Sequence, residues 1–149
     1  MNVFNIEKAF ADKKERGWTT LYVLIDAHGT AIEPGHDKVI FYDGALEVLE
    51  WFNRRSDFRT ILWTSSHKDE IKAIVQAAID KGVRFDFINS NPLEANSARA
   101  CFDRKFYFNI IFDDKAGFEP KTDWFLVKKE LQRIGEWDAV DNNENTVIL

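Results

Sequence analysis

The chain has 149 residues, of which 45% are hydrophobic and 30% are charged, and its net charge is −5. This length fits a single domain that buries a core without disulfides or metal staples, and the acidic balance gives no broad basic surface for nucleic acid. The single cysteine, Cys101, excludes a disulfide within the chain and disfavours a cysteine-based zinc site, and its aromatic neighbours indicate a small buried hydrophobic residue.

Helices and short apolar runs alternate along the chain. Each expected helix carries apolar side chains at a spacing that places them on one face, and each expected strand is an apolar run bounded by turn residues. The predicted helices are, in chain order, about 6–16, 44–54, the stretch between Ser66 and Gly82, and 123–134. The predicted strands are 21–25, 60–63, 85–88 and 106–112.

This alternation predicts right-handed βαβ units and a parallel sheet with helices on both faces. We therefore expect one α/β domain over 1–149, a Rossmann-like three-layer α/β/α arrangement with a mainly parallel central sheet and a core of about 18–135. Asp43 and Ser66 are the expected caps of the second and third helices.

Two stretches give no firm pattern. Residues 93–104 are the least readable part of the chain. The tail from 136 is acidic and asparagine-rich until 146–149, which is expected either to add an edge strand or to hang free. The first residues lack the plan of a signal peptide, and no apolar run approaches the roughly 20 residues of a membrane span. A cytoplasmic protein without a membrane partner is expected.

Three of the four predicted strands run into residues suited to chemistry. The first ends at Asp26, the second at Thr64 and Ser65, and the fourth at Asp113 and Asp114. Because the carboxyl ends of parallel strands share one edge of the sheet, these groups are expected to meet in one crevice. Clustered carboxylates stay ionised together around a cation, and hard divalent cations such as Mg²⁺ prefer oxygen ligands.

A lysine on the same rim would suit a phosphoryl group, and Lys105 directly precedes the fourth predicted strand. The order Asp-x-x-Gly-Thr, Thr/Ser, Lys, Asp-Asp resembles that of the haloacid dehalogenase-like superfamily of aspartate-nucleophile phosphatases. The strings Ile61-Leu-Trp-Thr64 and Asn89-Ser-Asn-Pro92, with Lys105 eight positions before Asp113, are similar to a small capless branch of phage and bacterial type. The resemblance covers about 21–118.

The resemblance implies a magnesium-dependent phosphohydrolase. Asp26 is expected to be the nucleophile that forms an aspartyl-phosphate. Asp26 and Asp114 are expected to bind Mg²⁺ through carboxylates, with the main-chain carbonyl of His28 as a third ligand. Asp113 would support the metal shell, directly or through water.

The same resemblance assigns the phosphate contacts. Thr64, with Ser65 as the alternative, would donate a hydrogen bond to a phosphate oxygen. Lys105 would neutralise charge on the nucleophile and on the transferring group. The main-chain N–H groups of Ala27 and His28 would help to hold the phosphate. The alternatives are that Thr64 only caps the following helix and that Lys105 is a solvated charge beside a strand.

His28 is the departure from the superfamily pattern. These phosphatases usually carry a second aspartate two residues after the nucleophile, which protonates the leaving group and then activates water. Histidine can do this work near neutral pH. The other readings of His28 are a turn residue without a catalytic role, or a degenerate site that binds a partner or a phosphate without efficient turnover.

The connections leave no room for a cap domain. Only 13 positions separate His28 from Phe41, and 16 separate Asn89 from Lys105. The site is therefore expected to be open, which suits a phosphorylated substrate as large as a macromolecule, or a homo-oligomer in which a neighbouring subunit acts as a lid. A two-component receiver domain also uses Asp, Thr and Lys on a parallel sheet, but its acidic pair comes first, the reverse of the order here.

Overall fold

The computed structural model describes residues 2–138. Its helices are α1 (Ile6–Arg16), α2 (Ala45–Arg54), α3 (Lys68–Asp80) and α4 (Asp123–Arg133). Its strands are β1 (Leu21–Asp26), β2 (Phe58–Trp63), β3 (Phe87–Ile88) and β4 (Ile110–Phe112). Two short 3₁₀ turns, η1 (Val3–Asn5) and η2 (Asp114–Ala116), precede α1 and follow β4. The expected edge strand or free end over 146–149 lies outside the described residues.

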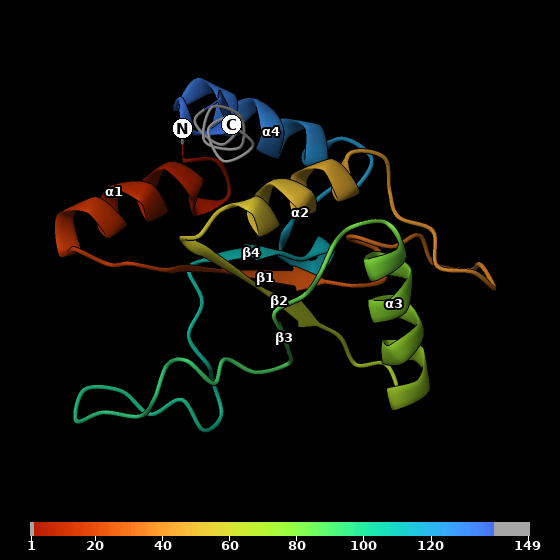
Figure 1. Cartoon of the computed structure of the whole chain (residues 1–149), viewed down its shortest axis with the longest axis horizontal. Coiled ribbons are helices and arrows are strands. Elements are labelled where there is room, and N and C mark those ends of the chain that lie inside the picture. Colours follow the sequence, from red (N-terminus) through yellow and green to blue (C-terminus); the bar gives the residue numbers. More distant parts are fainter. Residues whose placement is uncertain (1, 139–149) are drawn as a thin grey trace, which may run out of the picture.

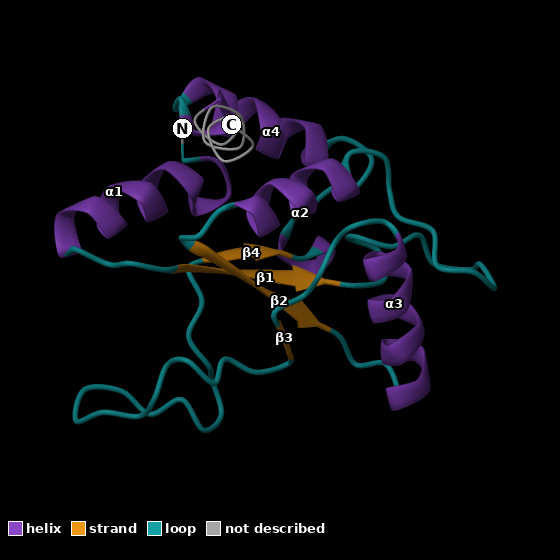
Figure 2. Ribbon diagram, in the orientation of Figure 1, coloured by secondary structure: helices purple, strands orange, loops and turns teal. Residues whose placement is uncertain are grey.

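The four strands form one parallel sheet in the order β3-β2-β1-β4 (Figure 2). β1 is central and pairs with β2 and β4, so that Asp26 lies opposite Trp63 and Ile25 lies opposite Phe112. The first strand therefore ends level with β2 and one residue beyond β4. This register brings the residues that follow β1, β2 and β4 to one edge of the sheet.

All four α-helices contribute to the core on one face of the sheet. Alternate residues of β1 point to this face (Leu21, Val23 and Ile25), as the period of a strand requires. The buried side chains of the helices join the same cluster, and the largest of them, Trp51 and Trp124, are fully buried. Figure 1 shows α1, α2 and α4 lying side by side over the sheet.

The other face of the sheet is covered by an irregular segment. Tyr22, Leu24 and Ile61 point to it and pack against aromatic side chains that include Phe106 and Tyr107. Between β3 and β4 the described chain forms no helix and runs as a loop (Figure 2). This layer therefore consists of loop backbone and the aromatic side chains that it carries. The α/β class with a four-stranded parallel sheet is thus confirmed, while the second covering layer is built without a helix.

The predicted fourth strand was too long at its start. Residues 106–109 are apolar enough to resemble a strand, but they serve to cover the sheet instead of extending it. Asn109 marks the transition. Its side-chain Oδ1 accepts a hydrogen bond from the Tyr22 N–H at 2.8 Å, and its own N–H donates to the Tyr22 carbonyl at 2.9 Å. The pairing of β4 with β1 begins only at Ile110, directly after these two hydrogen bonds of Asn109.

Several local predictions differ from the structure. Gly44 and His67 occupy the N-terminal cap positions of α2 and α3, and no side chain at these positions accepts a hydrogen bond from the first turn. Asp43 and Ser66 are therefore not the caps. The prediction of a buried Cys101 is wrong, because this residue is exposed and its thiol donates to Asp103 Oδ2 at 3.3 Å. It lies in the loop that covers the sheet, where its aromatic neighbours take the inner positions.

Neither long connection contains an inserted domain. Residues 27–44 form turns with two isolated bridges, one of them between Ile32 and Phe41. We call this segment the flap. Within residues 2–138, none of the helices has the length and apolar character that a bilayer span demands.

Candidate functional site

A pocket of about 520 Å³ lies at the carboxyl edge of the sheet, where β1, β2 and β4 end. Six of the eight residues that the sequence singled out for the site line it: Asp26, His28, Thr64, Ser65, Asp113 and Asp114. They come from three separate strand ends. The parallel topology therefore assembles the group that sequence reasoning expected to converge.

Three carboxylates form the centre of the pocket. One oxygen from each of Asp26, Asp113 and Asp114 lies within 4.8 Å of the others. Burial raises the pKa of Asp26 from 3.8 to about 6, and the negative charge of Asp113 and the proximity of Asp114 add to this rise. The negative charges of the three carboxylates repel one another, and a cation between their oxygens would reduce this repulsion.

The donor set fits Mg²⁺. All three side chains offer carboxylate oxygens, the hard ligands that Mg²⁺ prefers, and no cysteine or histidine nitrogen belongs to the cluster formed within residues 2–138. Mg²⁺ usually keeps several waters and needs only one or two protein carboxylates, which an open pocket allows. The residues present thus match the chemistry of the expected ion.

Thr30 joins the acidic groups, and sequence reasoning missed its role. Its Oγ1 donates to Asp26 Oδ2 at 3.2 Å and accepts from the Asp114 N–H at 2.9 Å. Thr30 is fully buried, and its carbonyl accepts the indole N–H of Trp124 at 2.8 Å. One hydroxyl therefore couples the end of β1 to the turn after β4. The available signal was its place in the Asp-x-x-Gly-Thr string.

Gly29 lets the flap approach the acidic turn. Its φ is +86°, and a Cβ at this position would lie 2.9 Å from Asp114 Oδ2. Only a residue without a side chain allows both this backbone conformation and this contact. Gly29 thus sets how closely β1 and the Asp113–Asp114 turn can meet.

Thr64 is held by a side chain that follows β3. Asn89 accepts from the Thr64 N–H through Oδ1 and donates to the Thr64 carbonyl through Nδ2, both at 2.9 Å. Asn89 lies in the left-handed region, with φ at +52°. The Thr64 hydroxyl donates to Ser66 Oγ at 2.9 Å and accepts from the Ser66 N–H at 3.1 Å. Asn89 also lines the pocket, and its position directly after a predicted strand was the signal for it.

His28 has a carboxylate partner. Its Nε2 lies 3.1 Å from Glu70 Oε1 in the first turn of α3, and both side chains are well exposed. Glu70 was not expected at the site, because nothing in its local sequence distinguishes it from other surface acids. The contact joins the flap to α3 and orients one ring nitrogen of His28.

Two residues that were expected to contact phosphate, Ala27 and Lys105, do not line this pocket. The Ala27 N–H donates to the Trp63 carbonyl at 3.2 Å and the residue is fully buried, so this N–H serves the sheet and not a ligand. The His28 N–H has no hydrogen-bond partner among residues 2–138. Lys105 is exposed and does not line the pocket, whereas Lys115 does.

The path of the chain explains why Lys115 lines the pocket and Lys105 does not. Residues 105–109 belong to the loop that covers the sheet, where Phe106 packs against Trp63 at 5.5 Å between ring centroids. Lys115 follows the acidic pair directly, and its N–H donates to Asp113 Oδ1 at 2.9 Å. The cation at the pocket wall therefore comes from η2, next to the acids.

Comparison with known proteins gives a fold likeness. No protein-family model matches the chain, and no curated protein matches it. A solved structure, of a conserved protein coded by a locus of Bacteroides thetaiotaomicron, aligns with a TM-score of 0.60 at 20% sequence identity. The alignment covers 76% of this chain and 91% of that chain. At this identity the likeness shows the α/β fold alone.

Proposed function

We propose that the protein is a magnesium-dependent phosphohydrolase of the haloacid dehalogenase-like type, which acts on phosphomonoesters through an aspartyl-phosphate. The observation that carries the proposal is the meeting of Asp26, Asp113 and Asp114 within 4.8 Å at the ends of parallel strands. Thr64 and Lys115 line the same pocket. The pocket therefore combines a nucleophile, carboxylate ligands for a metal cation, and two groups that can bind phosphate oxygens: the hydroxyl donor of Thr64 and the positive charge of Lys115.

Asp26 is the residue placed to attack. In the first step its carboxylate oxygen forms a bond to phosphorus while the bond from phosphorus to the leaving oxygen breaks. In the second step a water oxygen attacks the phosphorus of the aspartyl-phosphate, the bond to Asp26 breaks, and inorganic phosphate leaves. Thr30 keeps the other carboxylate oxygen fixed through its hydroxyl at 3.2 Å.

A bound Mg²⁺ would be held by Asp26, Asp113 and Asp114 and would neutralise negative charge on the phosphoryl group. Lys115 adds a second positive charge on the pocket wall. The Thr64 hydroxyl can turn from Ser66 to a phosphate oxygen without moving the backbone, because Asn89 holds both the N–H and the carbonyl of Thr64.

His28 is the proposed acid and base. As imidazolium it donates a proton to the leaving oxygen in the first step, and as neutral imidazole it accepts a proton from the attacking water in the second. Glu70, with Oε1 3.1 Å from Nε2, directs the orientation of the ring. The superfamily's usual aspartate is absent from this position, and the His28–Glu70 pair is the proposed substitute.

Phosphate release measured with Mg²⁺ over a panel of aryl and alkyl phosphates tests the proposal. We expect hydrolysis by the wild type, loss upon addition of EDTA, and loss in Asp26→Asn. Asp80→Asn, an exposed aspartate at the end of α3, is the matched control and should keep full activity. Absence of Asp26-dependent release on every member of the panel would refute the phosphohydrolase.

The role of His28 has its own test. His28→Ala should lower the rate for alkyl phosphates, which are poor leaving groups, by about 10²–10⁴-fold, the usual size of general acid catalysis. Aryl phosphates with good leaving groups need little protonation and should lose far less. Equal losses on both substrate types would contradict an acid role.

The second candidate is a protein of the same fold that binds phosphate without efficient turnover. The replacement of the expected aspartate by His28 is the observation that favours it. The two candidates differ in a measurement with beryllium fluoride, a phosphoryl mimic, and Mg²⁺. Binding that requires Asp26 without hydrolysis of any substrate would support the binding protein.

A further inference from the structure

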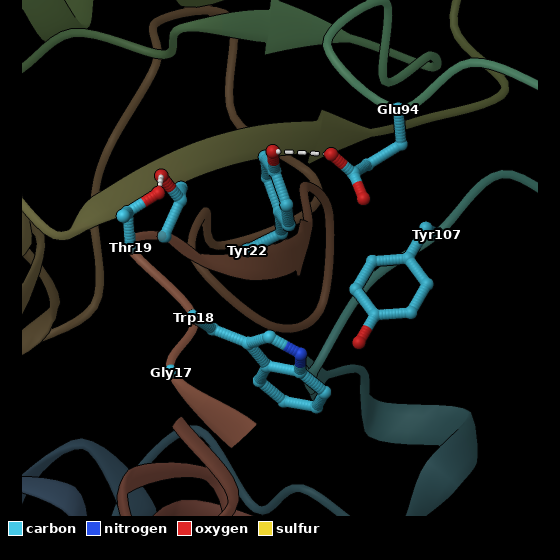
Figure 3. A pocket seen from close by; sticks show the side chains of 7 residues that line it. Gly17, Trp18, Thr19, Tyr22, Glu94 and Tyr107 are labelled. Atoms are coloured by element: carbon cyan, nitrogen blue, oxygen red, sulfur yellow. Dashed lines mark hydrogen bonds between the residues drawn. The ribbon is translucent and has the colours of Figure 1, made fainter. Parts of the chain in front are cut away.

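A second hollow lies at the start of β1, at the opposite end of the strand from Asp26 (Figure 3). Tyr22 and Asp26 are four positions apart, which places them about 13 Å from each other along the strand. The hollow has a volume of about 260 Å³, and its lining includes Trp18, Thr19, Thr20, Tyr22, Glu94 and Tyr107. It is therefore distinct from the acidic pocket and has a different chemistry.

Three aromatic rings form its walls. Trp18 and Tyr107 are at 88° with their centroids 6.4 Å apart, and Tyr22 and Tyr107 are at 89° with their centroids 6.0 Å apart. Figure 3 shows the three rings around one space. At these separations a positive charge beside Tyr107 can lie within about 6 Å of a second ring centroid, the range over which an aromatic ring attracts cations.

One carboxylate completes the hollow. Glu94 Oε2 accepts a hydrogen bond from the Tyr22 hydroxyl at 3.1 Å, while Glu94 Oε1 has no hydrogen-bond partner among residues 2–138. Burial and this hydrogen bond raise the pKa of Tyr22 to about 12, so the hydroxyl remains a neutral donor. The lining thus offers three aromatic rings, four hydroxyl groups and a single negative charge.

The cations nearest to the hollow do not fill it. The Arg16 guanidinium lies 5.6 Å from the Trp18 centroid but Arg16 does not line the hollow. Arg59 is close enough to lower the pKa of Tyr22 against the larger effects of burial and Glu94, and its Nη1 donates to the Phe58 carbonyl at 2.9 Å. Trp18 thus already has one cation within the range over which an aromatic ring attracts cations.

We propose that this hollow binds a small alkylated ammonium group, with Trp18, Tyr22 and Tyr107 as an aromatic cage and Glu94 as the counter-charge. Rings attract a quaternary ammonium through their electron-rich faces, and the methyl groups of the ligand pack on the same surfaces. The volume is below the 300–1,000 Å³ typical of pockets for larger ligands, which favours a compact head group. A free quaternary amine and a methylated lysine side chain share this chemistry.

Calorimetric titration of the full chain with choline chloride tests the site, at an ionic strength held constant with sodium chloride. 3,3-Dimethylbutan-1-ol, which has the same shape without the charge, is the matched ligand, and Nε-trimethyl-lysine separates a free amine from a side-chain source. We expect choline to bind at millimolar concentrations and the neutral alcohol not to bind. Stronger binding of trimethyl-lysine than of choline would assign the site to a methylated side chain.

The variants Trp18→Leu and Glu94→Gln should each weaken choline binding by about 2- to 30-fold. Glu94→Gln keeps an acceptor for the Tyr22 hydroxyl, so it tests the charge without disturbing the cage. Phe125→Leu removes an exposed ring on α4 and should bind choline as the wild type does. Circular dichroism confirms that each variant is folded. Equal affinity for choline and the neutral alcohol would overturn the proposal. So would an affinity for choline that is unchanged in both Trp18→Leu and Glu94→Gln.

Discussion

The acidic pocket should lower the stability of the protein when no cation is bound, and Asp26→Asn measures this cost. A rise in the pKa of Asp26 from 3.8 to about 6 corresponds to about 3 kcal/mol against the ionised form. Because the side chain is only partly buried, solvent screening reduces the expected effect to about 1–2 kcal/mol. Asparagine has nearly the same shape and can still accept the hydrogen bond from Thr30, so it removes mainly the charge.

The direction of the pH dependence follows from the same pKa. The folded state binds the Asp26 proton more tightly than the unfolded state does. Ionisation of Asp26 therefore does not lower the free energy of unfolding below pH 3.8, and it lowers it increasingly as the pH rises from 3.8 through about 6. Urea unfolding in EDTA should therefore show Asp26→Asn to be more stable than the wild type at pH 7, and equally stable near pH 4. The comparison between the two proteins cancels the titration of the groups that do not interact with Asp26.

Asp80→Asn is the control for this experiment, since that exposed side chain should give a pH-independent difference close to zero. A variant Asp26→Asn that is less stable than the wild type at pH 7 would refute the reasoning. So would a stabilisation that persists unchanged at pH 4, because it could not then arise from ionisation of Asp26.

Two substitutions probe the frame of the pocket, and one thiol measurement probes the loop that covers the sheet. Gly29→Ala should lower the free energy of unfolding more than Gly35→Ala does. Both glycines have positive φ, but only at Gly29 would the added Cβ lie 2.9 Å from Asp114 Oδ2. Urea unfolding compares the two variants, and equal losses of stability would contradict the close contact. Thr30→Val should destabilise by about 1–3 kcal/mol because it leaves the Asp114 N–H without its acceptor, and Thr19→Val on the surface is its control. Cys101 should react with Ellman's reagent in the native protein at the rate of a free thiol, and protection until unfolding would show that it is buried.

The sequence was sufficient for most elements of the fold because their patterns are local. The helix expected over 6–16 matches α1, since its apolar spacing, its basic end and Gly17 all describe one segment. The run 21–25 was recognisable as a buried strand because five apolar residues in succession fit a sheet covered on both faces. Such signals depend on neighbours in the chain and require no knowledge of distant contacts.

The second covering layer could not be read in the same way. An apolar run such as 106–112 has one composition whether it pairs as a strand or packs its rings on a sheet. The choice depends on Asn109, which binds the backbone of Tyr22 and ends the covering loop there. That contact joins residues 87 positions apart, so no local pattern contains it.

The residues of the site likewise fall into those that local patterns predict and those that depend on tertiary packing. Asp26, Thr64 and Asp113 follow strands, and topology alone brings strand ends together. Lys115 and Glu70 reach the pocket region through the turn of η2 and the placement of α3, which depend on tertiary packing. Lys105 was favoured by its spacing from the acidic pair, but its loop leaves it exposed outside the pocket, and its part in phosphate binding stays a prediction.

Binding of the proposed metal at the acidic cluster competes with protonation of Asp26. With its pKa at about 6, Asp26 carries a proton in part of the molecules at mildly acidic pH, and a cation would have to displace it. Binding of Mg²⁺ should therefore release protons near pH 6 and weaken as the pH falls, while Thr30 keeps the carboxylate in place in either state. A cation that binds only the folded state stabilises it by mass action, and this offsets the cost of the empty cluster. The self-repulsion among Asp26, Asp113 and Asp114 is thus an argument for a bound cation and not for a merely structural cluster.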